Sequence, residues 1–388
     1  MKLAVVVQRY GADIAGGSEA HCRLIAERLA VHHDVTALTT CATDYVTWDN
    51  ARPAGISVEG GVRIHRFPVA RPRALKRFAD LSDEVFDGHA QAEREREWFH
   101  ENGPDVPALI DHVRAHGADY DLVLFWTFRY ATTFFGLPHV ADRAILVPTA
   151  EEDAALELSV LRDFFALPAG WLFLTPEEQT LVGLRAGKTL EPSRVIGMGL
   201  DPVPAPGPRP TLPGTNGRYL LYLGRIDRNK GCHTLFEYFQ AWAETHPDIT
   251  LVMAGPAKMT VPTHRQIVPL GYVSDADRDA LLSHAEVLMV PSPYESLSIS
   301  LLEGWNHSRP ALVNGLCSVL DGQVRRANGG LPYRSAREFA AALDYLLVHD
   351  AERRTLGQQG LAYVDAEYRW PTVMARVESL LDAVRARR

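Results

Sequence analysis

The stretch Asp201-Pro-Val-Pro-Ala-Pro-Gly-Pro-Arg-Pro-Thr-Leu-Pro-Gly-Thr-Asn-Gly217 divides the sequence into two parts. Its six prolines cannot join a helix or a central strand, and they favour an extended, semi-rigid connector. On both sides of it, short β-branched runs alternate with segments of helix length. The runs cover residues 3–7, 35–38, 62–67, 122–125, 144–147 and 171–174, then 219–223, 249–253, 287–290 and 311–313. This alternation predicts the α/β class, with two Rossmann-like, doubly wound parallel sheets.

The domain boundaries follow from the same pattern. We expect an N-terminal Rossmann-like domain over residues 1–203, a proline-rich linker over 204–217, a second Rossmann-like domain over 218–367 and a C-terminal helix over 368–388. Two such domains that face each other would form a central cleft between the carboxyl ends of their strands, where folds of this kind bind ligands.

The composition is that of an ordinary folded protein. With 388 residues, of which 46% are hydrophobic and 23% charged, the chain is neither disordered nor fibrous. The formal net charge of −8 argues against a nucleic-acid partner, which requires a clustered basic surface. Cys22, Cys41, Cys232 and Cys317 lie far apart without zinc-site spacing, so we expect buried free thiols and no metal. The sequence shows neither a cleavable leader nor an apolar run of about 18 residues, which predicts a cytoplasmic protein.

Two loops have the composition of phosphate-binding loops. Gly16-Gly17 follows the first strand and permits close backbone approach, while Ser18 could cap the next helix; a tight turn alone would also explain both glycines. In the second half, Arg225 and Lys230 lie on the loop between a strand and a helix. An Arg fork and a Lys point charge suit a diphosphate leaving group, although the alternative is two surface cations.

The most informative segment is Val290-Pro-Ser-Pro-Tyr-Glu-Ser-Leu-Ser-Ile-Ser-Leu-Leu-Glu-Gly304. Its two prolines hold a non-helical turn before Ser296 or Ser298 starts a helix. Glu295 would then stand in the loop and Glu303 inside the helix. If the helix were extended back to residue 295, Glu303 would lie about 80° around the helix axis from the Glu295 position. Both carboxylates can face one cleft, where one could accept hydrogen bonds from a ribose and the other from a hexose, while the helix amides hold phosphate. The alternative for Glu303 is an ordinary amphipathic-helix carboxylate.

Three motifs occur in this order along the chain: Gly16-Gly17, Gly224-Arg225 with Lys230-Gly231, and Glu295-x7-Glu303. Together they resemble the motifs of the retaining glycosyltransferases of family four, which have the GT-B fold. The resemblance extends over nearly the whole chain, including the segment 197–201 and Trp370.

The resemblance implies a role for each of these residues. Arg225 and Lys230 would neutralise the diphosphate of a nucleotide-sugar, Glu303 would hold the ribose, and Glu295 would contact the donor sugar. The C-terminal helix would cross back onto the first domain. The residues so assigned to the nucleotide-sugar are Gly16, Gly17, Tyr272, Val273, Ser296, Leu297, Ser298 and Glu303.

The chain departs from the family pattern at two places. Ser298 stands where the family commonly has glycine. Where the family commonly has a His-Asp pair, this chain reads Pro148-Thr-Ala-Glu-Glu-Asp153, with Glu151 at the approximate position of the histidine. An ionised carboxylate cannot donate a hydrogen bond, so the acceptor or sugar contact there must differ. We group Glu151 with Arg225, Lys230 and Glu295 as catalytic candidates.

Two further segments have competing interpretations. Asp275-Ala-Asp277 resembles the metal-binding D-x-D of the other large glycosyltransferase fold, but Ser274 before it predicts a helix's first turn, where the aspartates complement the dipole. Residues 71–100 begin with four basic residues and then turn acidic. They could meet an anionic membrane or a phosphorylated acceptor, or they form a solvated helix face with mixed-charge pairs.

The predicted function is retaining transfer of a hexosyl-type sugar from a nucleoside-diphosphate sugar to the hydroxyl of a glycan, a lipid-linked or a small-molecule acceptor. We expect no cofactor and no metal, because Arg225 and Lys230 supply the charge that stabilises the leaving group. The alternatives are a GT-B sugar-nucleotide epimerase or hydrolase, and a catalytically weak nucleotide-sugar-binding partner subunit.

Overall fold

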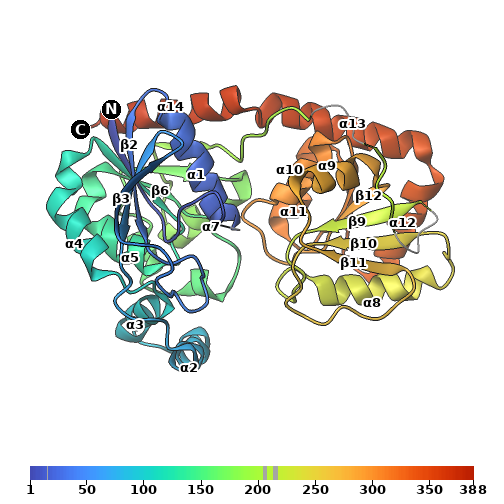
Figure 1. Ribbon diagram of the computed structural model, residues 1–388, viewed down its shortest axis with the longest axis horizontal. Coiled ribbons are helices and arrows are strands. Elements are labelled where there is room, and N and C mark those ends of the chain that lie inside the picture. Colours follow the sequence, from blue (N-terminus) through green and yellow to red (C-terminus); the bar gives the residue numbers. More distant parts are fainter. Residues whose placement is uncertain (15, 204–207, 213–216) are drawn as a thin grey trace. The chain divides into compact units, whose positions relative to one another are not determined.

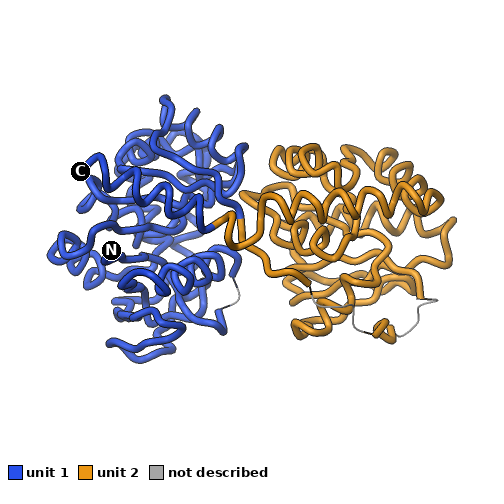
Figure 2. Tube along the Cα trace, turned by 90° about the horizontal axis from the view of Figure 1, so that it is seen from above, with its two compact units in different colours: residues 1–197, 374–388 blue, residues 198–373 orange. Residues whose placement is uncertain are grey.

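The computed structural model describes residues 1–388 except 15, 204–207 and 213–216. They form two compact units, residues 1–197 with 374–388, and residues 198–373 (Figure 2). Residues 198–203 and 368–373 therefore belong to the second unit, not to the first domain and the terminal segment as predicted. The reason is local pairing, since the Leu200 N–H donates to the Tyr368 carbonyl over 2.7 Å. Of the predicted linker, 204–207 and 213–216 lie outside the described residues.

The first unit is built on an eight-stranded sheet in the order β3-β4-β2-β1-β5-β6-β7-β8 (Figure 1). All neighbouring strands are parallel except β3 and β4, which form an antiparallel hairpin. The strands are β1 (Lys2–Val6), β2 (Asp34–Thr40), β3 (Gly55–Glu59), β4 (Val62–Phe67), β5 (Leu122–Trp126), β6 (Ala144–Val147), β7 (Gly170–Phe173) and β8 (Ser193–Val195). The α-helices are α1 (Gly17–Leu29), α2 (Leu75–Phe86), α3 (Ala92–Asn102), α4 (Pro107–His116), α5 (Ala131–Gly136), α6 (Leu161–Phe164) and α7 (Pro176–Ala186). Short 3-10 turns are η1 (Gly117–Asp119), η2 (Leu137–Arg143) and η3 (Ala154–Glu157).

The second unit is built on a six-stranded, fully parallel sheet in the order β11-β10-β9-β12-β13-β14. In Figure 1, α8 lies on one face of this sheet and α9 on the other. The strands are β9 (Tyr219–Leu223), β10 (Thr250–Ala254), β11 (Ile267–Gly271), β12 (Val287–Val290), β13 (Ala311–Asn314) and β14 (Gly330–Tyr333). The helices are α8 (Cys232–Ala243), α9 (Asp275–His284), α10 (Ile299–Asn306), α11 (Ser318–Ala327), α12 (Ala336–Val348) and α13 (Asp350–Glu367).

The strands of both sheets place their buried residues in the two cores, and the predicted α/β class with two Rossmann-like parallel sheets is confirmed. The last helix, α14 (Trp370–Arg385), begins in the second unit and belongs to the first unit from Met374 onward. Within the first unit, its Glu378 accepts from His33 over 2.9 Å. The four cysteines are buried and free, as predicted. No helix within the described ranges has the length and apolar character needed to cross a membrane.

Candidate active site

The loop between β9 and α8 brings Lys230 to the chain that leaves β12. Gly231 makes this possible: it has φ +72°, and a Cβ there would lie 2.1 Å from the Pro291 carbonyl oxygen. With the two loops in such close contact, Lys230 Nζ donates to Glu295 Oε1 over 2.9 Å. Two predicted site residues that are 65 positions apart thus form an ion pair. Their side chains are 29% and 10% exposed.

Asp227, which sequence reasoning missed, organises the same loop. One of its carboxylate oxygens accepts the Lys230 backbone N–H over 2.8 Å, and the other accepts from the Arg225 Nε. The Tyr222 hydroxyl donates to the Arg225 carbonyl over 2.6 Å, so both the side chain and the backbone of Arg225 are held. The signal was an aspartate three residues before a loop lysine, a common turn arrangement.

Of the two serines predicted to start helix α10, Ser296 and Ser298, the second is the cap. Ser298 is its N-cap, and its side chain accepts from the Leu301 N–H over 3.4 Å. Its own N–H donates to Oε1 of the fully buried Gln323 over 3.4 Å. Leu297 is buried, and Ser296 and Glu295 precede it in the loop, as predicted. The α10 N-terminus therefore lies in the same loop as the Lys230–Glu295 pair.

Glu303 lies in α10 and faces a different partner from Glu295. Arg278 of α9 places its Nε 3.6 Å from Glu303 Oε1, and the Glu303 side chain is 22% exposed. Burial raises the pKa of this carboxyl to about 7, with Asp279 acting in the same direction and Arg278 opposing both. Arg278 was not predicted as a site residue, because nothing in the local pattern shows which carboxylate a helical arginine meets.

Tyr272 and Val273 lie between β11 and α9, at the same carboxyl edge of the sheet as Glu295. Tyr272 is 82% exposed. In the sheet order, β11 is separated from β12 by β10 and β9. At the usual strand spacing, the loops that follow β11 and β12 are about 14 Å apart. An extended nucleotide-sugar has comparable dimensions, so one ligand can reach from Tyr272 to Glu295.

The D-x-D segment is the first turn of α9. Ser274 is the N-cap and accepts the Asp277 N–H over 3.1 Å, while Asp275 pairs with Arg278 over 2.9 Å. The helix-capping interpretation is therefore confirmed. The described parts of the chain contain no group of three or more His, Cys, Asp or Glu side chains placed to hold a metal ion.

In the first unit, packing explains the glycine at position 16. Helix α1 begins at Gly17, with Gly16 as its N-cap. The prediction that Ser18 caps this helix is wrong, because the Ser18 hydroxyl donates to Glu19 Oε2 over 2.8 Å instead. Glu19 is buried and paired with Arg9, and a Cβ on Gly16 would lie 2.3 Å from Glu19 Oε2. Glycine at 16 thus leaves room for a buried ion pair, whether or not a ligand binds there.

Glu151 follows β6 at the carboxyl edge of the first sheet. Beside it, Asp153 caps η3 and pairs with Arg129 over 2.5 Å, so the segment that departs from the family pattern contains an ion pair. Two threonines at the ends of β5 and β6 have left-handed backbone conformations, Thr127 with φ 66° and Thr149 with φ 50°. Arg129 and these threonines were missed, because left-handed threonine has no sequence signature.

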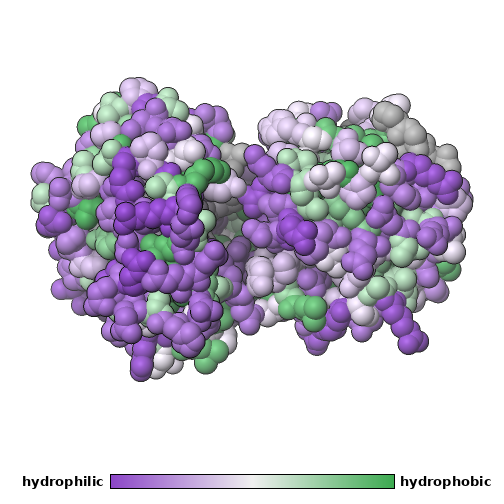
Figure 3. Space-filling view, turned by 90° about the horizontal axis from the view of Figure 1, so that it is seen from below, coloured by the Kyte–Doolittle hydropathy of each residue, from purple (hydrophilic) through white to green (hydrophobic). Residues whose placement is uncertain are grey.

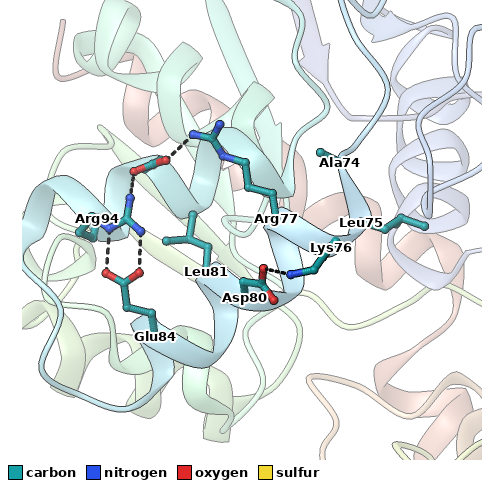
Figure 4. Close-up of a pocket in the computed structure, with 9 residues that line it drawn as sticks. Ala74, Leu75, Lys76, Arg77, Asp80, Leu81, Glu84 and Arg94 are labelled. Carbon is teal, nitrogen blue, oxygen red and sulfur yellow. Dashed lines mark hydrogen bonds and ion pairs between the residues drawn. The ribbon is translucent and has the colours of Figure 1, made fainter.

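A hollow of about 570 Å³ lies between α2 and α3, in the segment that follows β4 (Figure 4). Two of the four leading cations are paired within this segment: Lys76 with Asp80 over 2.7 Å, and Arg77 with Glu97 over 2.6 Å. Arg71 likewise donates to Glu101. This pattern favours the mixed-charge helix face over a membrane-binding segment. The face drawn in Figure 3 is largely hydrophilic, with small, separate hydrophobic patches.

Comparisons with known proteins agree with this architecture. Residues 217–349 match the family model described as glycosyl transferases group 1. The chain is 23% identical over 409 residues to glycogen synthase of Mycobacterium tuberculosis, covering 96% of this chain and 92% of that protein. Among solved structures, sucrose-phosphate synthase from Thermosynechococcus elongatus is similar with a TM-score of 0.72 at 18% identity, over 100% of both chains. Anabaena HepE in complex with UDP and glucose is similar with a TM-score of 0.68 at 14% identity, over 99% of this chain and 100% of that chain.

These findings confirm two of the predictions. The structural similarity shows the GT-B fold, and the group 1 domain in residues 217–349 shows the glycosyltransferase class. That domain contains Arg225, Lys230, Glu295 and Glu303, and so includes the cluster described above.

Proposed function

We propose that this chain, a glycosyltransferase with a group 1 domain on a GT-B fold, transfers a hexosyl-type sugar from a nucleoside-diphosphate sugar to an acceptor hydroxyl, with retention at the anomeric carbon. The observation that carries the proposal is the convergence of Arg225, Lys230 and Glu295 beside the N-terminus of α10. Two cations and a helix N-terminus suit a diphosphate, and a neighbouring carboxylate suits sugar hydroxyls.

The chemistry requires stabilisation of a departing diphosphate. In our proposal, Arg225 and Lys230 bind its oxygens and stabilise the charge that develops as the glycosidic bond breaks. Lys230 must then exchange its partner, because it is bound to Glu295 in this structure. Once Lys230 has turned to the phosphate, Glu295 can accept hydrogen bonds from the donor sugar. Donor binding thus replaces the Lys230–Glu295 ion pair by two contacts, one from Lys230 to the phosphate and one from the sugar hydroxyls to Glu295.

The remaining assignments belong to the same proposal. Glu303 accepts hydrogen bonds from the ribose, and Tyr272 and Val273 contact the base. Transfer needs no metal ion, since the two cations neutralise the diphosphate. We propose a uridine nucleotide as the donor, because HepE, which has the same fold, is described in complex with UDP and glucose.

A ligand screen followed by product analysis tests the proposal. Thermal shift of the purified chain with UDP, GDP, ADP and dTDP should show stabilisation by UDP, because a ligand that binds only the folded state raises its apparent stability. Incubation with labelled UDP-glucose and oligosaccharide acceptors should place the label in a glycoside of retained configuration. Labelled free glucose would indicate a hydrolase, and a changed nucleotide-sugar would indicate an epimerase. Binding without turnover of the purified chain would indicate a partner subunit.

A further inference from the structure

We propose that the second unit has an anion site at the amino edge of its sheet, where Arg309 and Arg354 bind the phosphate group of a small phosphorylated molecule. The site is a pocket of about 400 Å³, whose lining includes Arg309, Arg353, Arg354, Ser308 and Gln358. Pockets of this size hold small molecules rather than single ions. The inference goes beyond the proposed glycosyl transfer and does not depend on it.

The pocket lies at the end of the sheet opposite the predicted donor site. Glu286 comes directly before β12 and Pro310 directly before β13, so these lining residues stand where two parallel strands begin. Glu295 follows β12, beyond the other end of the same strand. The four residues of β12 span about 13 Å. The pocket is therefore separate from the Lys230–Glu295 pair.

A close approach of α13 to the turn after α10 forms the pocket. Gly357 of α13 packs against this turn, and a Cβ there would lie 2.1 Å from the Ser308 carbonyl oxygen. Ser308 itself has φ 56°, which reverses the chain at the end of α10. Arg353 and Arg354 lie one helical turn before Gly357, so the same packing brings them to the pocket that Arg309 lines.

Arg309 is a half-buried cation held by backbone carbonyls rather than by a carboxylate. Its Nε donates to the His307 carbonyl over 3.0 Å, and its Nη1 donates to the Ala285 carbonyl over 3.2 Å. Among the residues that the structure describes, no carboxylate lies within ion-pair distance of this guanidinium. Burial lowers the pKa of Arg309 and Arg353 acts in the same direction, while Glu286 opposes both. A bound anion would offset the cost of burying this charge.

Arginines outnumber carboxylates around the pocket. Glu286 accepts from Arg353 over 2.8 Å and from Arg218 over 3.1 Å, so one carboxylate serves two guanidinium groups. Asp350 pairs with Arg353 over 2.8 Å and lies 3.8 Å from Arg354. With the half-buried arginine after α10, four guanidinium groups face two carboxylates, which leaves a formal charge of +2. A phosphate monoester, with a charge of about −1.5 to −2 at neutral pH, matches this excess.

The lining also indicates what carries the phosphate. A guanidinium binds phosphate oxygens in a planar fork, and Arg354, whose side chain is 73% exposed, can turn to the ligand at little cost. Next to these cations, the Gln358 amide and the Ser308 hydroxyl can exchange hydrogen bonds with hydroxyl groups. A small sugar phosphate therefore fits better than inorganic phosphate, because it uses both parts of the pocket.

Isothermal titration calorimetry at low ionic strength tests the site, with UDP present just above the concentration that fills the donor site. Ribose 5-phosphate should bind more tightly than inorganic phosphate, and ribose should not bind. Arg309→Gln should weaken ribose 5-phosphate about tenfold or more, and the exposed Arg354→Gln about threefold to fivefold. Arg325→Gln is the matched control and should change nothing, since Arg325 is a 69% exposed arginine of α11 paired with Asp321 over 2.6 Å.

Each outcome decides the proposal. Equal ribose 5-phosphate affinity of Arg354→Gln and Arg325→Gln would overturn the site, and this comparison holds even if Arg309→Gln does not fold, because Arg354 is exposed. Ribose binding as tight as that of ribose 5-phosphate would overturn the charge argument, and tighter binding of inorganic phosphate would overturn the ligand class. Failure of UDP to bind would contradict the proposed function instead, and the same titrations without UDP would still test this site.

Discussion

Glu295→Gln should separate binding of the intact donor from binding of the free diphosphate. In this structure Glu295 has a defined partner, Lys230 Nζ at 2.9 Å, and we assign it a second partner, the donor sugar. The glutamine retains the shape and an acceptor oxygen but loses the charge. It therefore weakens the sugar contact while it releases the lysine that should bind phosphate.

The two effects have different sizes. A hydrogen bond to a charged group contributes about 1.5–3 kcal/mol, which predicts about a 10–150-fold weaker sugar contact. For the diphosphate alone, no sugar contact is lost. At 2.9 Å the pair attracts by about 1.4 kcal/mol at a dielectric constant of about 80 and about 6 kcal/mol at about 20. Because 29% of the Lys230 side chain is exposed, screening brings the net cost of parting to about 1 kcal/mol. Diphosphate affinity should therefore rise by up to about fivefold.

Calorimetric titration of the variant with UDP and with UDP-glucose measures both numbers. The ratio of the two dissociation constants should shift by at least about tenfold against the intact donor. Glu286→Gln serves as the control, since Glu286 also forms a half-buried ion pair in the second unit, with Arg353 over 2.8 Å. If Glu295→Gln weakens both ligands equally, Glu295 does not contact the sugar, and if UDP also binds more weakly, the partner exchange by Lys230 is refuted.

Three further predictions concern charge at named side chains. Arg225→Ala and Lys230→Ala should each lower kcat/KM by about 10²-fold or more, and the loss in the double variant should be smaller than the product of the two single losses. EDTA should leave transfer intact. Loss of activity in EDTA that Mg²⁺ restores would contradict this assignment. The pKa of Glu303, raised to about 7, predicts that UDP affinity increases from pH 6 to pH 8, because only the ionised carboxylate accepts from both ribose hydroxyls. Glu303→Gln should remove this pH dependence. If the variant keeps it, the titrating group lies elsewhere. Burial lowers the pKa of His21 to about 4, so protonation favours the unfolded state as pH falls from about 6.5 towards 4. The denaturant concentration at the unfolding midpoint should therefore fall over that pH range in wild type. It should fall equally in the control His32→Gln, at an exposed histidine, and less in His21→Gln.

The central strands were predictable, and the edge strands were not. β4, β6, β9 and β12 have the predicted bounds. β6, β9 and β12 are apolar throughout, which is the strong signal of a strand covered on both faces, whereas β4, next to the edge strand β3, alternates in the sequence VRIHRF. β3 and β11 lie at sheet edges, where one face or side meets solvent. β3 is largely exposed and β11 contains Pro269, so neither forms an apolar run.

The positions of site residues could also be predicted, but their partners could not. Glu295 in a loop and Ser298 as a cap follow from prolines and a serine within a few residues, which are local effects. The pairing of Lys230 with Glu295 depends on the packing of Gly231 against Pro291, which no local pattern expresses. The same is true of Arg129 and Asp153, which lie on loops after neighbouring strands.

The charged candidates of the second unit are each held by an opposite charge without a substrate: Lys230 by Glu295, Arg225 by Asp227 and Glu303 by Arg278. Because the three cations are about a third exposed, the pairs contribute only about 1 kcal/mol each, but they hold the side chains in place in the empty site. They also mean that a ligand gains only the difference between its own contacts and those it replaces. In the proposed mechanism, a free diphosphate would displace Lys230 from Glu295 and leave that carboxylate without a cation, whereas an intact nucleotide-sugar would supply hydroxyls to it. On this proposal the pairing disfavours the product relative to the donor, and the return of Lys230 to Glu295 would assist release of the diphosphate after transfer.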